Sequence, residues 1–169
     1  LGGVVGPNPN GREMGTVDVH FTTPDGLSPL FEPGVHRGHT SHLEAVLEPP
    51  RGSVVLARTA QDPHSALRYG RRQWGTQFHP EFDAEILRRY VEARREVLLG
   101  EGRDPDAMIA EIEETPELAR VLERFARVVS GVSSPATTCT GRFLRRSPAR
   151  PASSISVRVS LRPGSSLTG

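Results

Sequence analysis

The stretch from Trp74 to Phe82 reads W-G-T-Q-F-H-P-E-F and carries the most informative pattern in this chain of 169 residues. Pro80 excludes a helix at that point and fixes its own backbone angle φ. In an extended segment, residues two apart point to the same side of the chain and lie about 6.5 Å apart. His79 and Glu81 are therefore expected to form an imidazole–carboxylate pair at the place where a strand ends.

Downstream of this stretch, apolar residues recur with the period of an α-helix. Asp83 is suited to be the N-cap of a helix that ends before Gly100. The apolar face of that helix consists of Ile86, Leu87, Tyr90, Val91 and Leu98. Asp104 and Thr115 each precede a proline, and proline is tolerated at the first helical position, so two further helix starts are predicted. The last helix is expected to stop at Gly131.

Upstream of Trp74 the pattern is that of β-strands. Residues 14–22 alternate apolar with polar side chains, which is the period of a half-buried strand. Further strands are predicted over residues 53–59, 65–69 and 73–78, the last two flanking a short hairpin loop. Residues 36–46 are expected to pass from a loop into a short strand, and residues 1–13, rich in Gly, Pro and Asn, to form a loop. The first half of the chain is thus predicted to be mostly sheet.

The formal net charge of +1 is the sum of two unlike segments. Residues 131–169 contain six arginines, no acidic residue and few large apolar residues. Such a segment cannot bury enough surface to offset its chain entropy, so it is expected to be a basic, disordered tail. Its one alternating stretch, residues 155–161, has no visible partner strand. Residues 1–130 contain the other 15 arginines and all 20 acids, and they are expected to form one domain.

Simple counts exclude several classes of protein. The single cysteine, Cys139, can form neither an internal disulfide nor a cysteine-rich zinc module, which fits a reducing cytoplasm. No apolar run approaches the ~18 residues of a membrane span. The chain starts without a methionine and without the charged region of a signal peptide, so it is expected to be part of a longer protein. It contains no P-loop, so an amide-forming step would need another domain or chain.

Residues 75–82, G-T-Q-F-H-P-E-F, resemble the G-x-Q-F-H-P-E segment of class I, triad-type glutamine amidotransferase domains. In that segment a histidine and a glutamate complete a Cys-His-Glu triad. Other similar pieces occur in the family's order: residues 2–5 and 12–15 (G-G-V-V and R-E-M-G), residues 41–46 (S-H-L-E-A-V) and residues 115–125. The chain, over residues 1 to about 130, therefore resembles the C-terminal half of such a domain, of the stand-alone, GMP synthase-like subgroup.

The resemblance implies an α/β, flavodoxin-like class I glutamine amidotransferase fold, truncated at the N-terminus, with C-terminal helices. It also implies hydrolysis of glutamine to glutamate and ammonia through a γ-glutamyl thioester on a cysteine. His79 would be the general base and Glu81 would orient it. The backbone of Ser41, His42 and Leu43 would contact the substrate glutamine. No cofactor or metal is implied, and the implied partner is a synthase domain or chain that receives the ammonia, with no membrane or nucleic acid involved.

One part of the family's machinery has no counterpart here. The family carries its nucleophile in a G-x-C-x-G motif, N-terminal of the matching region, and these 169 residues contain no such motif. Cys139 lies in T-T-C-T-G, after the last expected helix, and does not replace it. The chain as written is therefore expected to lack glutaminase activity. The alternative hypothesis is a non-catalytic, glutaminase-like module that binds or regulates a partner.

Two other features suggest a metal site and a nucleic-acid arm. His36, His39 and His42 are spaced by three, which brings imidazoles together for a metal on a helix. Gly38 and the β-like residues after it argue against a helix there. The basic tail suits a nucleic-acid arm electrostatically, but Phe143 is its only aromatic residue for stacking on bases.

Overall fold

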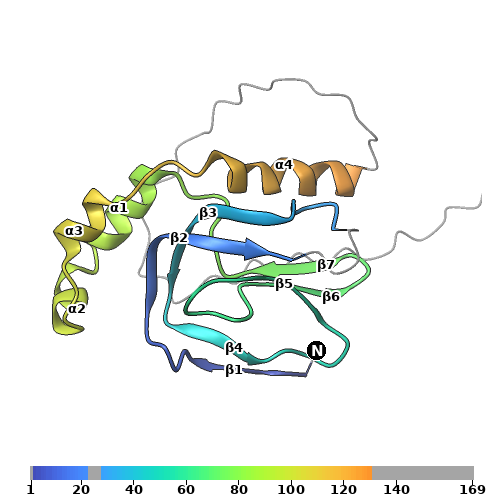
Figure 1. Cartoon of the computed structure of the whole chain (residues 1–169), viewed down its shortest axis with the longest axis horizontal. Helices are drawn as coiled ribbons and strands as arrows, with labels where there is room; N and C mark the ends of the chain where they lie inside the picture. The colour runs from blue at the N-terminus through green and yellow to red at the C-terminus, as the bar shows by residue number, and fades with distance from the viewer. Residues whose placement is uncertain (1, 23–27, 131–169) are drawn as a thin grey trace, which may run out of the picture.

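The computed structural model of the chain describes residues 2–22 and 28–130. Within these residues, strands occupy the first half and helices the second, as the sequence predicts (Figure 1). Five strands form one antiparallel sheet. In spatial order they are β3 (Gly34–His42), β2 (Glu13–Phe21), β5 (Val54–Arg58), β6 (Ala66–Gly70) and β7 (Gln73–Thr76). A separate antiparallel ribbon pairs β1 (Val4–Pro7) with β4 (Glu44–Glu48).

The helices lie in two places around the sheet. They are α1 (Ala84–Glu92), α2 (Arg95–Gly100), α3 (Pro105–Ala110) and α4 (Pro116–Ser130). Figure 1 shows α1, α2 and α3 together at one end of the sheet and α4 alongside β3. The predicted cap at Asp83 is confirmed, because its carboxylate accepts a hydrogen bond from the Ile86 N–H at 2.7 Å. Asp104 caps α3 in the same way, and α4 begins at the predicted proline.

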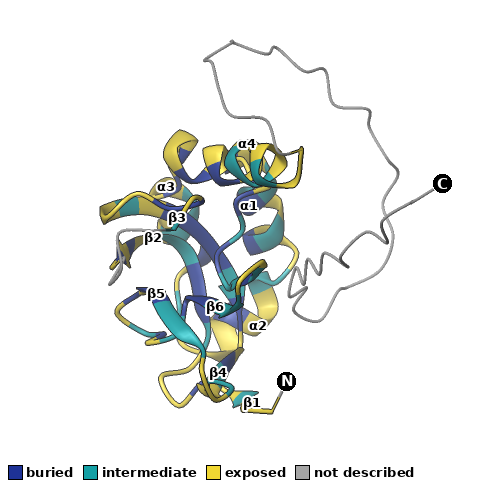
Figure 2. Cartoon of the chain, turned by 90° about the vertical axis from the view of Figure 1, so that its right-hand side faces the viewer, coloured by how far each residue is buried: buried dark blue, intermediate teal, exposed yellow. Residues whose placement is uncertain are grey.

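Opposite faces of β2 contribute to two hydrophobic cores. Val19 and Phe21 are buried against α4 and the inner faces of β5, β6 and β7. Met14 lies on the other face of β2, since side chains alternate along a strand, and packs with Phe82 and residues of α1 and α2. Figure 2 shows the buried residues along β2 and β3, while β1 is mostly exposed. Helix α4 thus covers one face of the sheet, and α1, α2 and α3 pack at the end of β2 that carries Met14.

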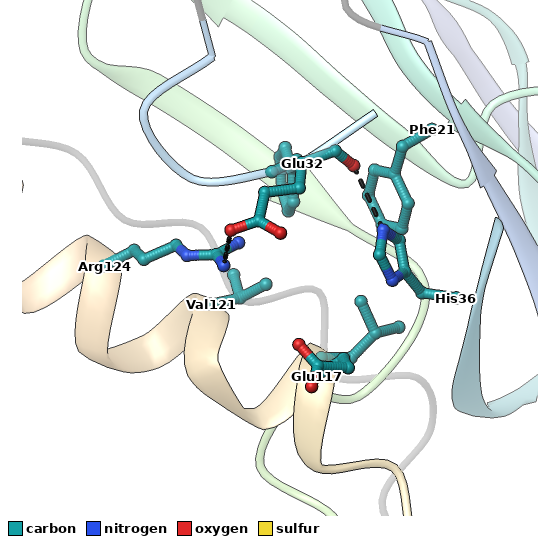
Figure 3. Close-up of a pocket in the computed structure, with 8 residues that line it drawn as sticks. Phe21, Glu32, His36, Glu117, Val121 and Arg124 are labelled. Carbon is teal, nitrogen blue, oxygen red and sulfur yellow. Dashed lines mark hydrogen bonds and ion pairs between the residues drawn. The ribbon is translucent and has the colours of Figure 1, made fainter. Parts of the chain in front are cut away.

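Helix α4 contacts β3 closely at a glycine. A Cβ atom built on Gly38 would lie 2.4 Å from Leu118 Cδ1 and 3.0 Å from Val19 Cγ2. Nearby, Arg124 of α4 donates hydrogen bonds to the Glu32 carboxylate and to the Leu30 carbonyl. Figure 3 shows this ion pair beside a small cavity. A short backbone-to-helix distance and a charged contact therefore fix the position of α4.

Three local predictions are wrong, each because a contact distant in sequence decides the structure. Residues 4–7 form β1, rather than a loop, because β4 supplies their hydrogen-bonding partner. Residues 34–42 form a full strand, β3, which pairs with β2 along its whole length and is followed by β4. The helix predicted from Asp83 to Gly100 is two helices, α1 and α2. Both helices contribute to one core, α1 through Val91 and α2 through Leu98, together with Met14 and Phe82 from other segments.

The predicted tail, with its alternating stretch at residues 155–161, lies outside the described residues. In the part of the chain that the structure does describe, no helix has the length and apolar character needed to cross a membrane.

Replacing Gly38 with alanine should destabilise the protein by about 1–3 kcal/mol, because the new methyl group overlaps with Leu118. Chemical denaturation measures the loss. Gly100→Ala is the control, since a Cβ there meets open space, and it should be neutral or slightly stabilising. An unchanged stability of Gly38→Ala would contradict the packing of α4 on β3.

Candidate active site

The segment that follows β7 is fixed against the outer edge of β3. Phe78 forms an isolated antiparallel bridge with Thr40, and the His79 N–H donates to the His39 carbonyl at 2.8 Å. Phe78 itself is buried in the core under α4. Backbone contacts with β3 therefore fix the position of the His79 backbone at a strand edge.

His79 and Glu81 form the pair that their spacing predicts. His79 Nδ1 lies 2.8 Å from Glu81 Oε1. The prediction assumed extended backbone, and this assumption is wrong. Residues 80 and 81 form a turn, closed by a hydrogen bond from the Phe82 N–H to the His79 carbonyl at 3.2 Å. The proline that excludes a helix here favours this turn, so the pair forms across it.

The His79 ring is confined on one face by an aromatic side chain. Phe82 stacks on it with ring centroids 4.1 Å apart and planes 10° apart, and Tyr90 of α1 contacts Phe82 in turn. The His79 side chain is 10% exposed, against 39% for Glu81. Nε2 of His79 makes no hydrogen bond to the described residues. The ring is thus oriented through Nδ1 and leaves Nε2 available to accept a proton.

The protonation of this pair follows from its contacts. Burial is the largest single influence and would raise the pKa of Glu81. The hydrogen bond and charge attraction from His79, together with a backbone hydrogen bond, outweigh it, and the pKa lies below its ordinary value of 4.5. Glu81 is therefore a carboxylate near neutral pH, and His79 Nδ1 carries the hydrogen that it accepts. This arrangement places the lone pair of the neutral imidazole on Nε2, as a general base requires.

Ser41, His42 and Leu43, the residues implied for substrate contact, lie at the end of β3 just beyond the bridge to Phe78. Leu43 is exposed, and its carbonyl accepts a hydrogen bond from the Asn8 N–H. The His42 side chain, in contrast, is buried. The structure therefore brings the backbone of these residues to the same sheet edge as His79.

A buried charged pair lies directly behind this strand end. His42 Nε2 is 3.0 Å from Glu13 Oε2, and His42 Nδ1 is 2.9 Å from the Glu44 carbonyl. Both ring nitrogens face acceptors, so the imidazole must donate twice, as an imidazolium does. Burial is the largest single influence and would lower the pKa of His42. The contacts with Glu13, the Glu44 carbonyl and the charge of Asp62 together outweigh it, so the pKa is raised. The end of β3 thus sits on a buried ion pair.

The same cluster extends into the loop after β5. Thr59 donates its hydroxyl hydrogen to Glu13 Oε1 and accepts a hydrogen bond from the Asp62 N–H. Asp62 is fully buried, and this burial raises the pKa of its carboxyl group. The loop of residues 59–65 is therefore tied to β2 through Glu13, which in turn contacts His42 of β3.

The three histidines weighed as a metal site do not converge. Paired residues of β2 and β3 share a face, so His36 and His42 lie on one face of β3 and His39 on the other. His39 is fully buried, contacts the Thr16 hydroxyl at 3.2 Å, and has its pKa lowered by burial. Among residues 2–22 and 28–130, no three metal-binding side chains come together.

An open, largely apolar cleft of about 250 Å³ adjoins the His79–Glu81 pair. It is lined by Leu30, Phe31, Trp74, Gly75, Thr76, Pro80, Glu81, Val121, Leu122 and Phe125. Trp74 Nε1 is buried and has no hydrogen-bond partner among the described residues. β7, which forms one wall, is the last strand in the order of the described sheet. The cleft therefore combines an open strand edge with an apolar surface next to Glu81.

Comparisons with known proteins give a consistent result. The glutamine-hydrolysing GMP synthase of Aeropyrum pernix is 37% identical over 98 residues, which are 58% of this chain and 18% of that protein. A glutamine-hydrolysing GMP synthase subunit from Ignicoccus hospitalis is 39% identical over 85 residues, 47% of this chain and 42% of that protein. The chain is a relative of the glutamine amidotransferases. It spans less than half the length of these two relatives, and no model of a known family matches it.

Solved glutamine amidotransferases share the fold. A glutamine amidotransferase from Thermotoga maritima superposes with a TM-score of 0.60 at 23% identity, over 75% of this chain and 54% of that one. One from Methylobacillus flagellatus gives a TM-score of 0.59 at 23% identity, over 83% and 61%. The expected α/β glutamine amidotransferase fold is therefore confirmed. The strands described in this chain form an antiparallel portion of it.

Sequence reasoning missed three residues that shape the site. Phe82 stacks on His79. The only local indication of this contact is an aromatic residue three positions after a histidine, next to a turn. His39 supplies the carbonyl that fixes His79. Glu13 pairs with His42, and its only local signal is an acid at the start of an alternating strand. The last two contacts join distant segments, which spacing alone does not reveal.

Replacing His79 with alanine should raise the pKa of the Glu81 carboxyl group. The substitution removes the hydrogen bond that lowers this pKa and leaves the burial that raises it. A ¹³C NMR titration of the Glu81 carboxyl carbon measures the shift. His20→Ala, on an exposed part of β2, should leave the titration unchanged. A Glu81 pKa that does not move in His79→Ala would show that the pair is absent in solution.

Replacing Glu13 with glutamine should cost about 1–3 kcal/mol of stability in mildly acidic solution. The raised pKa of His42 means that the pair stabilises the fold fully below the ordinary imidazole pKa of 6.5 and less as pH rises through the raised value. The difference in unfolding free energy between wild type and variant should therefore shrink as pH rises. Glu85→Gln, which removes an exposed helix pair, should show a small loss without that slope. A constant difference would contradict a charged His42.

Proposed function

We propose that this chain supplies the base half of a glutamine-hydrolysing site. His79 acts through Nε2 as the general base, and Glu81 keeps the hydrogen on Nδ1. The observation that supports this proposal is the 2.8 Å contact between His79 Nδ1 and Glu81 Oε1, together with an Nε2 that makes no hydrogen bond to the described residues. The names of the relatives, glutamine-hydrolysing GMP synthases, favour glutamine as the substrate.

The proposed chemistry needs a nucleophilic cysteine in a G-x-C-x-G motif. These 169 residues contain no such motif. His79 Nε2 takes the proton from the thiol, and the thiolate attacks the side-chain amide carbon of glutamine. The same proton then passes to the leaving nitrogen, so that ammonia departs and a γ-glutamyl thioester remains. Water, deprotonated by His79, adds to the thioester carbon, and glutamate leaves as the thiolate forms again.

Substrate contact is proposed for the backbone of Ser41, His42 and Leu43. These residues end β3 at the same edge that receives His79, so a glutamine next to Nε2 would lie against them. The Glu13–His42 pair behind them keeps this backbone in place. The nucleophile would enter from the side of the apolar cleft, where β7 has an open edge beside Glu81. Residues 1–130 are proposed as a partial amidotransferase domain.

The ammonia is proposed to pass to a synthase domain or chain. The matched relatives are named as glutamine-hydrolysing synthases, and this chain covers only part of each. A second candidate is a non-catalytic, glutaminase-like module. The absence of a G-x-C-x-G motif from these 169 residues is compatible with it, and ammonia release from glutamine distinguishes the two functions.

The decisive measurement is ammonia release from glutamine. The chain alone should release none above background, because it lacks the nucleophile motif. In a protein that carries a G-x-C-x-G nucleophile segment ahead of this chain, His79→Ala should lower kcat about 10²–10⁴-fold. Glu81→Gln should lower it less, and His20→Ala should leave it unchanged.

Two outcomes would contradict the proposal. Ammonia release from the chain alone that disappears in His79→Ala would show that the nucleophile is already present. An upstream sequence without a G-x-C-x-G motif, combined with no activity of the longer protein, would favour the non-catalytic module.

A further inference from the structure

The β6–β7 hairpin borders an open hollow of about 370 Å³, at the end of the sheet away from His79. Gly52, Val54, Arg68, Gly70 and Arg71 line it. Val54 of β5 lies opposite Arg68 of β6, which brings the turn at residues 51–52 next to the turn at residues 71–72. No carboxylate is among the lining residues. The volume lies in the range of small-molecule sites.

The charge of this region is opposite to that of the rest of the domain. Residues 49–80 contain five arginines and a single acid, Asp62, which is fully buried elsewhere in the fold. The other residues of 1–130 contain ten arginines and nineteen acids. The β5–β7 part of the sheet is therefore a basic region within residues 1–130, which otherwise carry an excess of acids.

Most arginines elsewhere in the described residues have a protein partner, with Arg58 and Arg127 as exceptions. Arg12, Arg37, Arg95, Arg120 and Arg124 each form an ion pair with a carboxylate. Arg51, Arg71 and Arg72 make no hydrogen bond or ion pair with the described residues, and all three are exposed. Their guanidinium groups have donors that the described part of the fold does not use.

We propose that this hollow binds a phosphate group, with Arg71 as the main contact. A guanidinium group presents paired N–H donors that match two phosphate oxygens, and such charge-assisted contacts are stronger than neutral ones. Gly52 has a φ of +82° and open space around its Cβ position, so a ligand can approach the backbone there. This site is separate from the His79–Glu81 pair and does not depend on the proposed glutamine hydrolysis.

The charge distribution favours a small ligand over a nucleic acid. A long polyanion that followed the β6–β7 hairpin would also meet the acidic remainder of the domain and be repelled. A small phosphate compound, such as free phosphate, pyrophosphate or the phosphate of a nucleotide, occupies only the basic region. The shared chemistry is a phosphate group with oxygens open to bidentate contact.

Isothermal titration of the full chain with pyrophosphate tests the proposal. Saturable binding at one site is expected, and Arg71→Ala should raise the Kd about tenfold or more. The Kd of Arg71→Lys should lie between those of the wild type and Arg71→Ala, because lysine keeps the charge and loses the paired donors. Parallel titrations with inorganic phosphate, a nucleoside monophosphate and the matching nucleoside identify the source of the group. If the site takes a nucleotide, the nucleoside monophosphate should bind more tightly than inorganic phosphate. If it takes free phosphate, the nucleoside monophosphate should bind no more tightly than inorganic phosphate.

Two matched controls separate a defined site from general attraction. Arg72 lies in the same turn and does not line the hollow, and Arg127 lies on α4. Alanine at either position should change the Kd less than about twofold. Equal losses in Arg71→Ala and Arg72→Ala would overturn the proposal, as would the absence of saturable binding by every phosphate probe. The proposal would also be overturned if duplex DNA bound more tightly than every small phosphate probe and if this binding weakened equally in Arg71→Ala, Arg72→Ala and Arg127→Ala.

Discussion

The hydrogen bond from the His79 N–H to the His39 carbonyl fixes the segment on which both hydrophobic cores depend. Phe78, on one side of His79, is buried in the core under α4. Phe82, on the other side, is buried in the core under α1 and α2. The turn between them brings Glu81 to Nδ1 of His79. The geometry of the proposed base is therefore a product of packing on both faces of the sheet.

Charge has different roles in different parts of this fold. The Glu13–His42 pair is buried and joins β2, β3 and the loop of residues 59–65, so it is expected to matter for the position of the strand end. Most ion pairs on the helices are exposed and contribute little to stability. The arginines of the β6–β7 turn have no such partners among the described residues. A near-neutral total charge conceals these three situations.

Local signals in the sequence were sufficient where local contacts decide the structure. The alternation that ends at Phe21 predicted β2, and Asp83 capped α1, because both depend on neighbouring residues. The His79–Glu81 pair was also found by spacing, since only a turn separates its members. The length of β3 was predicted too short because its buried residues include His39 and Thr40. Polar residues give no apolar alternation in the sequence, so their burial could not be predicted from it. β1 and the break after α1 likewise depend on partners distant in sequence.

The contact between β3 and His79 also bears on the order of folding. Strands β2 and β3, and the β6–β7 hairpin, pair segments that are close in sequence and lose little entropy on closing. The bridge from Thr40 to Phe78 closes a loop that includes β4, β5, β6 and β7. Closing this longer loop costs more chain entropy than closing either hairpin, so the bridge is expected to form after the hairpins. On this basis the imidazole is expected to reach its place only after both hairpins have formed, so a chain that holds the hairpins alone would not expose an oriented base.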